Sequence, residues 1–294
     1  MTARVLRSET EFLKGQKLLS TDVSGMRLTE EGQALLHTLN DLMREALGLK
    51  ELETALKQRL NVARVVVVAG DSDRSPWVKK ELGRACVACM KEQLRPGDIV
   101  AVAGGTTMAA VAEMMTPDPK LADVLFVPAR GGLGEDVENQ ANTICAKMAE
   151  KATGRYRLLH VPDQLSGEAY ASLIEEPAVK EVLELIQSCR MVVHGIGEAV
   201  TMAKRWKTPP VEMEKIIARH AVAEAFGYYF NEHGDVVHKV KTVGIQLENL
   251  PHVEHVIAVA GGASKAKAIQ AYIKRAPNSL LVTDEGAAKA LVGD

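Results

Sequence analysis

The chain has 294 residues, of which 47% are hydrophobic and 25% are charged, enough apolar material for one large or two smaller folded domains. Its 36 basic and 38 acidic side chains nearly cancel, so any attraction to nucleic acid must come from a local patch. The N-terminal residues lack an apolar stretch of signal-peptide length, and no apolar run approaches the roughly 18 residues of a membrane span. A cytoplasmic protein without a membrane partner is expected.

The first sixty residues predict a helix, a two-stranded wing and a second helix. The helical stretch "RVLRSETEFLKG" precedes "GQKLLSTDVSGMRLTEEG", in which Thr29 can cap the next helix and Glu30 and Glu31 suit its positive end. This order matches the back half of a winged helix-turn-helix, whose first helix here would enter the major groove and turn Arg4 and Arg7 toward DNA. A solvated basic helix fits the same spacing. The earlier helices of the motif do not precede this stretch, so a module without DNA binding stays an alternative.

A long apolar seam follows the wing. Its members recur every three or four positions: Leu35, Leu39, Leu42, Ala46, Leu49, Leu52, Leu56 and Leu60. The spacing predicts one helix of seven turns, which either pairs two subunits or packs on the next domain. We favour the pairing, and place a first domain at residues 1–61.

Residues 62–294 predict a different architecture. Short runs rich in Val, Ile and Leu occur at 64–70, 99–104, 123–130, 155–162, 189–197, 255–262 and 279–284, with helical patterns between them. Runs without alternation indicate strands buried on both faces. The fold class is therefore α/β, a doubly wound, mostly parallel sheet, in which ligands bind beyond the carboxyl ends of the strands.

The stretch "AVAGGTTMAAVAEMM" is the first candidate site. Gly104 and Gly105 let the backbone approach a bound group, and Thr106 and Thr107 place hydroxyls at a helix N-terminus. Backbone amides, the positive end of the helix dipole and two hydroxyls suit a phosphate, although a tight turn capped by threonine has the same sequence. Neither GK[ST] nor GxGxxG is present, so nucleoside triphosphates and dinucleotides are disfavoured.

Two further strand ends carry anion-binding side chains. Arg130 closes one strand beside two glycines, with Gln140 and Asn142 near the next helix start; guanidinium suits phosphate or carboxylate, and amides suit hydroxyls. The stretch "VAGGASKAKAIQ" repeats strand, two glycines and helix start, with Ser264 and Lys265 in place of the threonines. Lys265 is expected to face the phosphate at Thr106, a solvated lysine being the alternative.

The four cysteines do not indicate a metal site. Cys86 and Cys89 form a CxxC within the helix-like "KKELGRACVACMKEQL", and no second pair completes a ligand set. We expect them to pack inside the protein. No metal and no cofactor are expected.

Taken in order, "GGTT", "PARGG" with "ENQAN", "GIGEA", "VAGGASKAKAI" and "LVTDEGAAKAL" resemble the effector-binding domain of the SorC family of sugar-responsive bacterial regulators. The resemblance covers the whole chain and implies a sugar-phosphate isomerase-like effector domain, a transcriptional repressor of glycolytic genes, and fructose 1,6-bisphosphate as the effector that loosens DNA binding. It implies that Gly105, Thr106, Thr107 and Lys265 bind one phosphate. Arg130, Gln140, Arg205 and Glu224 would surround the sugar and the second phosphate.

Two of these assignments have ordinary alternatives. Arg205 precedes two prolines that would end its helix and place its guanidinium in a cleft, with a surface cation as the alternative. Glu224 lies on an otherwise apolar face, where an acid needs a hydroxyl or cation partner, unless it is a helix-surface acid.

The competing interpretation is an enzyme of the sugar-phosphate isomerase or deaminase kind, whose sheet is similar. Such an enzyme needs an acid or base against the sugar carbons. The candidates are Glu135, Asp136, His194 and Glu198, none in a recognisable catalytic signature. We read the first two as a helix-start pair and His194 as a core histidine, so no catalytic residue is assigned.

Overall fold

The computed structural model describes residues 3–22, 25–132, 136–162 and 167–293. The chain divides into two compact units, Met1–Lys50 and Glu51–Asp294.

The first unit contains the expected helix, wing and second helix. Its elements are α1 (Ala3–Gly15), β1 (Leu19–Asp22), β2 (Gly25–Leu28) and α2 (Glu30–Ala46), and the two strands are antiparallel. The Thr29 hydroxyl accepts a hydrogen bond from the Gly32 amide at 3.0 Å, which confirms the predicted helix cap. A Cβ at Gly32 would lie 2.1 Å from the Leu18 carbonyl oxygen, so glycine is required where the wing packs on the helix.

The prediction of one continuous helix through the seam is wrong. α2 ends at Ala46 and α3 (Leu49–Leu60) begins after Gly48, whose φ of 66° is the left-handed conformation that ends helices. The interruption divides the seam into two parts with different surroundings. In α3, Leu56 and Leu60 belong to the second unit and are buried, whereas the α2 leucines Leu35, Leu39 and Leu42 are 42%, 47% and 59% exposed.

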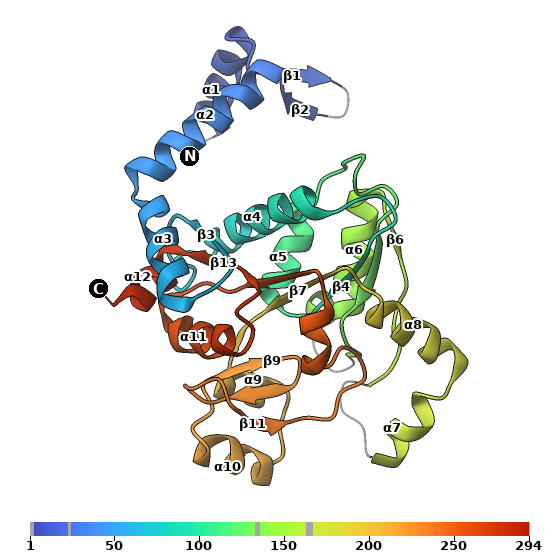
Figure 1. The fold of residues 1–294 in the computed structure, drawn as a ribbon. Coiled ribbons are helices and arrows are strands. Elements are labelled where there is room, and N and C mark those ends of the chain that lie inside the picture. The colour runs from blue at the N-terminus through green and yellow to red at the C-terminus, as the bar shows by residue number, and fades with distance from the viewer. Residues whose placement is uncertain (1–2, 23–24, 133–135, 163–166, 294) are drawn as a thin grey trace. The chain divides into compact units, whose positions relative to one another are not determined.

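The second unit is built on a parallel sheet of seven strands, as predicted (Figure 1). In spatial order these are β3 (Arg64–Val68), β13 (Leu280–Asp284), β12 (His255–Val259), β7 (Met191–Gly195), β4 (Ile99–Val102), β5 (Leu125–Pro128) and β6 (Arg155–Tyr156). The strands are shorter than the apolar runs from which they were predicted. The run at 155–162 yields only the two residues of β6, because it lies at the edge of the sheet and pairs with β5 alone.

Helices cover both faces of this sheet, as a doubly wound fold requires (Figure 1). One layer contains α4 (Val78–Gln93), α5 (Thr106–Met114) and α6 (Ala141–Ala152); the other contains α8 (Pro177–Gln187), α11 (Ala266–Arg275) and α12 (Glu285–Val292). Cys86 and Cys89 are buried on α4, as expected. The remaining short elements are η1 (Val137–Asn139), α7 (Gly167–Leu173), η2 (Leu247–His252) and η3 (Ala263–Lys265).

A small antiparallel sheet lies between β7 and β12 in the chain and was not anticipated. It consists of β8 (Gly197–Glu198), β9 (Ala223–Ala225), β10 (Tyr228–Phe230) and β11 (Val236–Lys239), accompanied by α9 (Ala199–Arg205) and α10 (Pro210–Ala218). Its strands have two to four residues, too few for a period-two pattern to be recognised in the sequence.

The topology selects one place for a ligand. β4 and β7 are neighbours, but the chain leaves β4 toward β5 and leaves β7 toward β12, on the other side. The crevice beyond their carboxyl ends is the switch point at which α/β sheets bind ligands. It is formed by Ala103–Thr107 after β4 and by Ile196 and Gly197 after β7.

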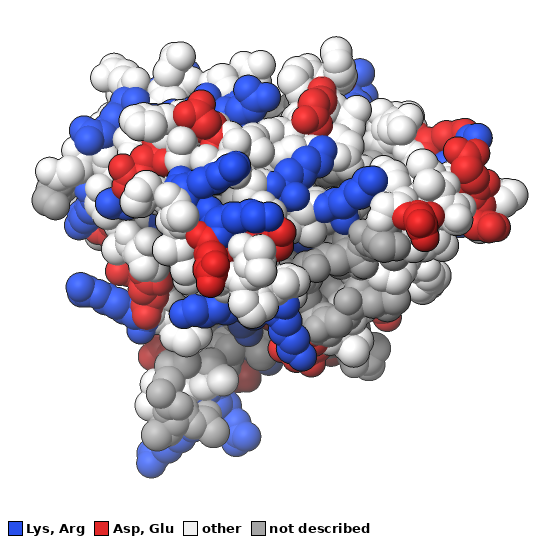
Figure 2. All heavy atoms as spheres, turned by 90° about the horizontal axis from the view of Figure 1, so that it is seen from below, with Lys and Arg blue, Asp and Glu red and all other residues white. Residues whose placement is uncertain are grey.

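The surface carries both charge signs. Basic and acidic side chains are interspersed on the face shown in Figure 2, in keeping with the net charge of −2. Across the described ranges, no helix combines the length and apolar character needed to cross a membrane.

Candidate functional site

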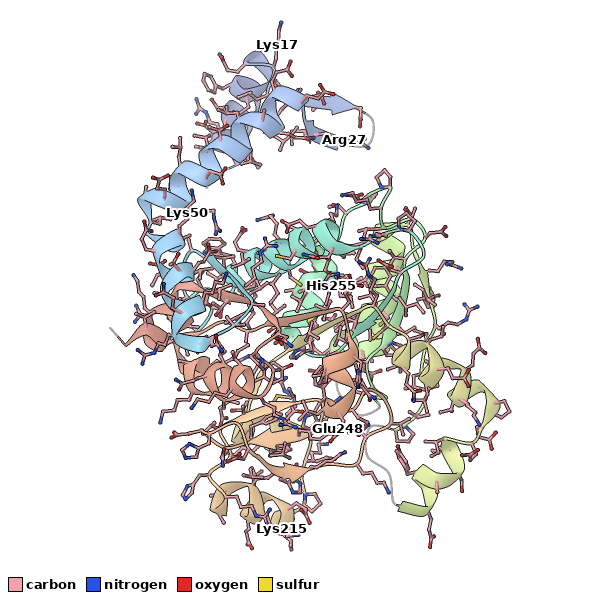
Figure 3. All side chains as sticks on the ribbon, viewed as in Figure 1. Lys17, Arg27, Lys50, Lys215, Glu248 and His255 are labelled. Carbon is pink, nitrogen blue, oxygen red and sulfur yellow. The ribbon has the colours of Figure 1, made fainter. Side chains whose placement is uncertain are left out.

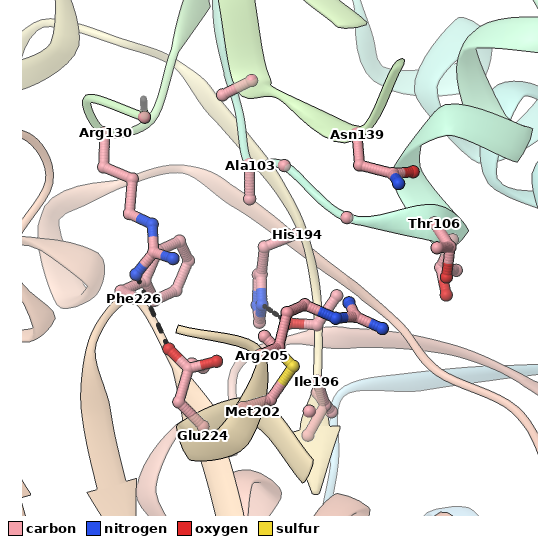
Figure 4. Close-up of a pocket in the computed structure, with 18 of the residues that line it drawn as sticks. Ala103, Thr106, Arg130, Asn139, His194, Ile196, Met202, Arg205, Glu224 and Phe226 are labelled. Carbon is pink, nitrogen blue, oxygen red and sulfur yellow. Dashed lines mark hydrogen bonds and ion pairs between the residues drawn. The ribbon is translucent and has the colours of Figure 1, made fainter. Parts of the chain in front are cut away.

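All nine residues expected to bind the phosphosugar line one pocket at the switch point (Figure 4). They are Gly104, Gly105, Thr106, Thr107, Arg130, Gln140, Arg205, Glu224 and Lys265. The pocket has an empty volume of about 790 Å³, including the solvent at its mouth. One wall comes from the ends of the parallel strands and the other from the small antiparallel sheet. This division explains why residues 120 positions apart in the chain meet there, as Gly104 and Glu224 do.

The turn between β4 and α5 is shaped to receive an anion. Gly105 has φ 111° and ψ 162°, a conformation available almost only to glycine, and no side chain caps α5 at this end. Its amide donates to the Asn139 carbonyl at 2.8 Å, and a Cβ at Gly104 would lie 2.7 Å from that oxygen. Thr106 is exposed and Thr107 is buried at the first turn of the helix. The start of α5 therefore presents backbone amides and hydroxyls to the pocket.

Lys265 supplies a cation beside this turn. Its ammonium donates to the Ile196 carbonyl at 3.1 Å. Burial lowers the pKa of Lys265, and the nearby cations Lys79 and Arg205 lower it further, while Asp73 and Asp284 act in the opposite direction. An anion bound next to Lys265 would relieve both unfavourable effects.

Arg130 and Glu224 form an ion pair on the other side of the pocket. Arg130 Nη1 lies 3.6 Å from Glu224 Oε1, and the two side chains are only 11% and 6% exposed. The Arg130 guanidinium also lies 4.5 Å from the centre of the Trp206 ring. Glu224 lies on β9, so the alternative of a helix-surface acid is wrong, and its Oε1 accepts a hydrogen bond from the Gly227 amide at 2.7 Å.

Arg205 and Gln140 complete the polar lining. Arg205 is the last residue of α9 and is exposed, and Figure 4 shows its guanidinium on the side of Thr106. The two prolines expected to end this helix instead begin α10, where Pro210 needs no amide partner. Gln140 is the half-buried residue preceding α6. Asn142 does not line the pocket, because its side-chain amide bonds both backbone groups of Leu159 at 3.0 Å.

The turn at Gly261 and Gly262 is not open to an anion in the way that the turn at Gly104 and Gly105 is. At the turn before η3, the Asp73 carboxylate accepts hydrogen bonds from the Ser264 amide at 2.8 Å and the Ser264 hydroxyl at 3.1 Å. The Gly262 amide is likewise bonded to Asp284, at 2.8 Å. The protein's own carboxylates thus take the anion positions of this turn, and only Lys265 reaches the pocket.

Among the lining residues that were not expected from the sequence are Asn139, Trp206, Phe226 and Ile196. Asn139 and Ile196 act through their backbone carbonyl groups, which accept from the Gly105 amide and the Lys265 ammonium, and a pattern of side chains does not reveal such contacts. Trp206 stacks on Arg130, and its position directly after Arg205 was the one available signal. Phe226 lies in the tight β9–β10 turn with φ 56°, a conformation that bulky residues rarely adopt.

Glu198 and His194, two of the four residues considered for catalysis, have structural roles. The Glu198 carboxylate caps α9 by accepting from the Val200 and Thr201 amides, and these bonds lower its pKa against the opposing effect of burial. His194 is fully buried, which lowers its pKa to about 4. Asp136 is exposed and Glu135 lies outside the described residues. Within the part of the chain that is described, no cluster of three His, Cys, Asp or Glu side chains could hold a metal.

Arg4 and Arg7 are both exposed on α1. Figure 3 adds Lys17, on the turn after α1, and Arg27, on the wing strand β2, both pointing to solvent. Arg4, Arg7, Lys17 and Arg27 are therefore exposed basic side chains of the first unit.

Comparison with known proteins agrees with the two parts of the chain. Residues 44–293 match the family model described as "Putative sugar-binding domain", and residues 1–43 match the "CggR N-terminal DNA binding domain". The chain belongs to the SorC family of transcriptional regulators. It is 64% identical to the central glycolytic genes regulator of Priestia megaterium and 62% identical to that of Bacillus subtilis, covering all of this chain and 86% of each relative.

Solved SorC structures share the fold. A SorC family transcriptional regulator from Enterococcus faecalis superposes with a TM-score of 0.78 at 47% identity, covering 82% of this chain and 99% of the other. The full-length sorbitol operon regulator SorC from Klebsiella pneumoniae superposes at 0.73 over 82% of this chain and 80% of its own, at 20% identity, which bears on the fold alone. The family is one of transcriptional regulators, so the enzyme interpretation is set aside.

Proposed function

We propose that this SorC regulator is a repressor of glycolytic genes. Its effector domain, residues 62–294, binds fructose 1,6-bisphosphate, and this binding lowers the affinity of residues 1–61 for DNA. The observation that carries the effector proposal is the convergence of nine expected ligand residues on one pocket. Three of them are cations and one is an acid already paired with Arg130, so the lining has an excess of positive charge. The names of the relatives support the link to glycolytic genes.

The first phosphate is assigned to the start of α5. Amides after Gly105, the hydroxyls of Thr106 and Thr107, and the ammonium of Lys265 supply donors of the kind that bind phosphate. The second phosphate and the sugar are assigned to Arg130, Arg205, Gln140 and Glu224. In Figure 4, Arg130 and Thr106 lie on opposite sides of the pocket, which suits a ligand with an anion at each end.

DNA release must arise from a difference in affinity. The effector shifts the equilibrium only if it binds the released conformation more tightly than the DNA-bound one, by typically about 1 to 3 kcal/mol. The exposed leucines of α2 support a homodimer or homotetramer, since a soluble chain does not easily leave such a seam bare. In an oligomer, a small rotation between subunits is enough to spoil the match to two DNA half-sites.

The effector site is tested by calorimetric titration with fructose 1,6-bisphosphate and fructose 6-phosphate. We expect saturable binding of the bisphosphate that is strongly weakened by Thr106→Val, and weakened by about 1.5 to 3 kcal/mol by Lys265→Ala. Thr116→Val, an exposed position just beyond the other end of α5, is the matched control and should bind as the parent does. Unchanged affinity in both pocket variants would remove the phosphate from this site.

DNA binding is tested separately. The purified chain is used to select its own site from a random-sequence duplex pool, and release of the selected duplex by fructose 1,6-bisphosphate is followed by fluorescence anisotropy. We expect Arg4→Ala with Arg7→Ala to abolish enrichment while leaving bisphosphate binding unchanged. Failure of the parent chain to enrich any sequence would leave an effector-binding module without DNA binding.

A further inference from the structure

His194, at the end of β7, is buried at the floor of the pocket and both of its ring nitrogens are engaged. Nδ1 lies 2.9 Å from the Gly195 carbonyl oxygen and Nε2 lies 2.8 Å from the Tyr272 hydroxyl. A carbonyl only accepts hydrogen bonds, so Nδ1 carries the proton, and Nε2 then accepts from the tyrosine. A single neutral tautomer satisfies every partner, and the ring is fixed in place.

The ring is also packed from two sides. The Phe226 ring centroid lies 4.5 Å from that of His194, and the Tyr272 centroid lies 4.8 Å away in an edge-on arrangement. Figure 4 shows His194 between Phe226 and Ile196 in the middle of the pocket. Phe226 retains its unfavourable left-handed backbone, φ 56°, while its ring rests on the imidazole.

Each neighbour of His194 leads to one of the two phosphate-binding ends. On one side, Gly195 is followed by Ile196, whose carbonyl accepts from Lys265 at 3.1 Å. Tyr272 belongs to α11, the helix that begins directly after Lys265.

On the other side, Phe226 precedes Gly227, whose amide donates to Glu224 at 2.7 Å. Glu224 in turn pairs with Arg130 at 3.6 Å. His194 is therefore connected to both ends of the pocket. The chain after β7 connects it to Lys265, and the β9–β10 turn connects it to Glu224 and Arg130.

We propose that His194, fixed by Tyr272, is a positioning residue that sets the spacing between Lys265 and Arg130 and so selects a sugar with two phosphates over one with a single phosphate. This inference rests on the proposed phosphosugar function. A monophosphate needs only one of the two cations, so its affinity does not depend on their spacing. A bisphosphate must meet both at once, and a loosened spacing reduces the benefit of the second contact.

The test compares the ratio of dissociation constants for fructose 6-phosphate and fructose 1,6-bisphosphate, by calorimetry, in matched variants. Tyr272→Phe removes one hydroxyl and leaves Nε2 without its donor, and His194→Gln keeps a polar group in reach of Tyr272 but loses the bond to Gly195. In both we expect bisphosphate affinity to fall on the order of tenfold, with monophosphate affinity changed about threefold or less.

Tyr228→Phe is the control, because it also deletes a buried tyrosine hydroxyl, one bonded to Gln246 and Glu248, and Tyr228 is not part of the pocket lining. It should lower the melting temperature and leave the ratio unchanged. An imidazole nitrogen NMR spectrum should show the Nδ1-protonated tautomer of His194 in the parent chain and a changed tautomer balance in Tyr272→Phe.

Equal loss of affinity for both sugars in Tyr272→Phe and His194→Gln, or an unchanged ratio in folded variants, would overturn the inference while leaving the proposed function intact. A parent chain that binds neither sugar would overturn the proposed function and this inference with it.

Discussion

Neutralising Glu224 tests whether Arg130 binds an anion of the ligand. Glu224→Gln keeps the shape of the side chain and an oxygen that can accept from the Gly227 amide, but it removes the negative charge 3.6 Å from Arg130. Both side chains are nearly inaccessible to solvent, so water compensates poorly for the lost partner.

The magnitude follows from that geometry. Two unit charges at this separation interact by about 4 to 5 kcal/mol at the effective dielectric constant of about 20 that suits protein sites. Breaking a buried pair typically costs about 3 to 5 kcal/mol, and the retained acceptor and the Trp206 ring over Arg130 place this case near 3 kcal/mol. A bound phosphate would replace the missing charge. We expect the loss to shrink by about 1 to 2 kcal/mol with saturating bisphosphate, which corresponds to about tenfold tighter binding.

Urea denaturation with and without saturating fructose 1,6-bisphosphate measures both quantities. The control is Glu232→Gln, which removes the same charge from the solvent-exposed pair with Lys267 and should change stability little in either condition. A stability loss in Glu224→Gln that is the same with and without ligand would refute the assignment of an anion to Arg130.

The remaining predictions concern stability. Burial holds the pKa of His194 at about 4 in the folded protein, whereas the unfolded value is near 6.5, so the unfolded state binds the proton first as the pH falls. The free energy of unfolding should therefore fall by up to about 3 kcal/mol between pH 6.5 and 4. Urea titrations of His194→Asn should show a smaller dependence of that free energy on pH. Leu56→Ala should cost about 2 to 5 kcal/mol because the side chain is fully buried, whereas Leu39→Ala should cost little in the monomer and weaken self-association in sedimentation velocity; the reverse pattern would contradict the division of the seam. Gly105→Ala meets no atom within 4 Å but keeps a glycine-only backbone, so its cost of about 1 to 3 kcal/mol should come from strain, and an unchanged unfolding midpoint would speak against it.

The sheet and the α5 turn were predictable because their signals are local. Seven runs of buried, branched residues are explained by seven strands, since a strand covered on both faces needs apolar side chains at every position. A close backbone approach was predictable at Gly104 because glycine has no Cβ, although the group that approaches it here is the protein's own Asn139 carbonyl, 2.7 Å from the position of a Cβ. The cap by Thr29 is local in the same sense.

Predictions failed where distant residues decide the outcome. The seam from Leu35 to Leu60 has one period, but Gly48 interrupts it, and Leu56 in its second half is fully buried whereas Leu39 in its first half is 47% exposed. The sequence "AGGAS" offers the same anion turn as "AGGTT", yet Asp73, about 190 positions away, already occupies it. The sequence left open whether Glu224 is a helix-surface acid, and the pairing of β9 with β10 decides against it.

The sequence by itself determined the α/β class, the strand ends rich in glycine and the residue types able to bind a phosphorylated sugar, because these depend on burial, backbone freedom and charge at neighbouring positions. Only the tertiary structure decided which of those groups meet. It brought Arg130 to Glu224 and Lys265 to Ile196, and it placed His194 between them, because the small antiparallel sheet folds back over the switch point of the large one. Contacts between residues so far apart in the chain depend on its topology, which cannot be deduced from a local pattern of residues.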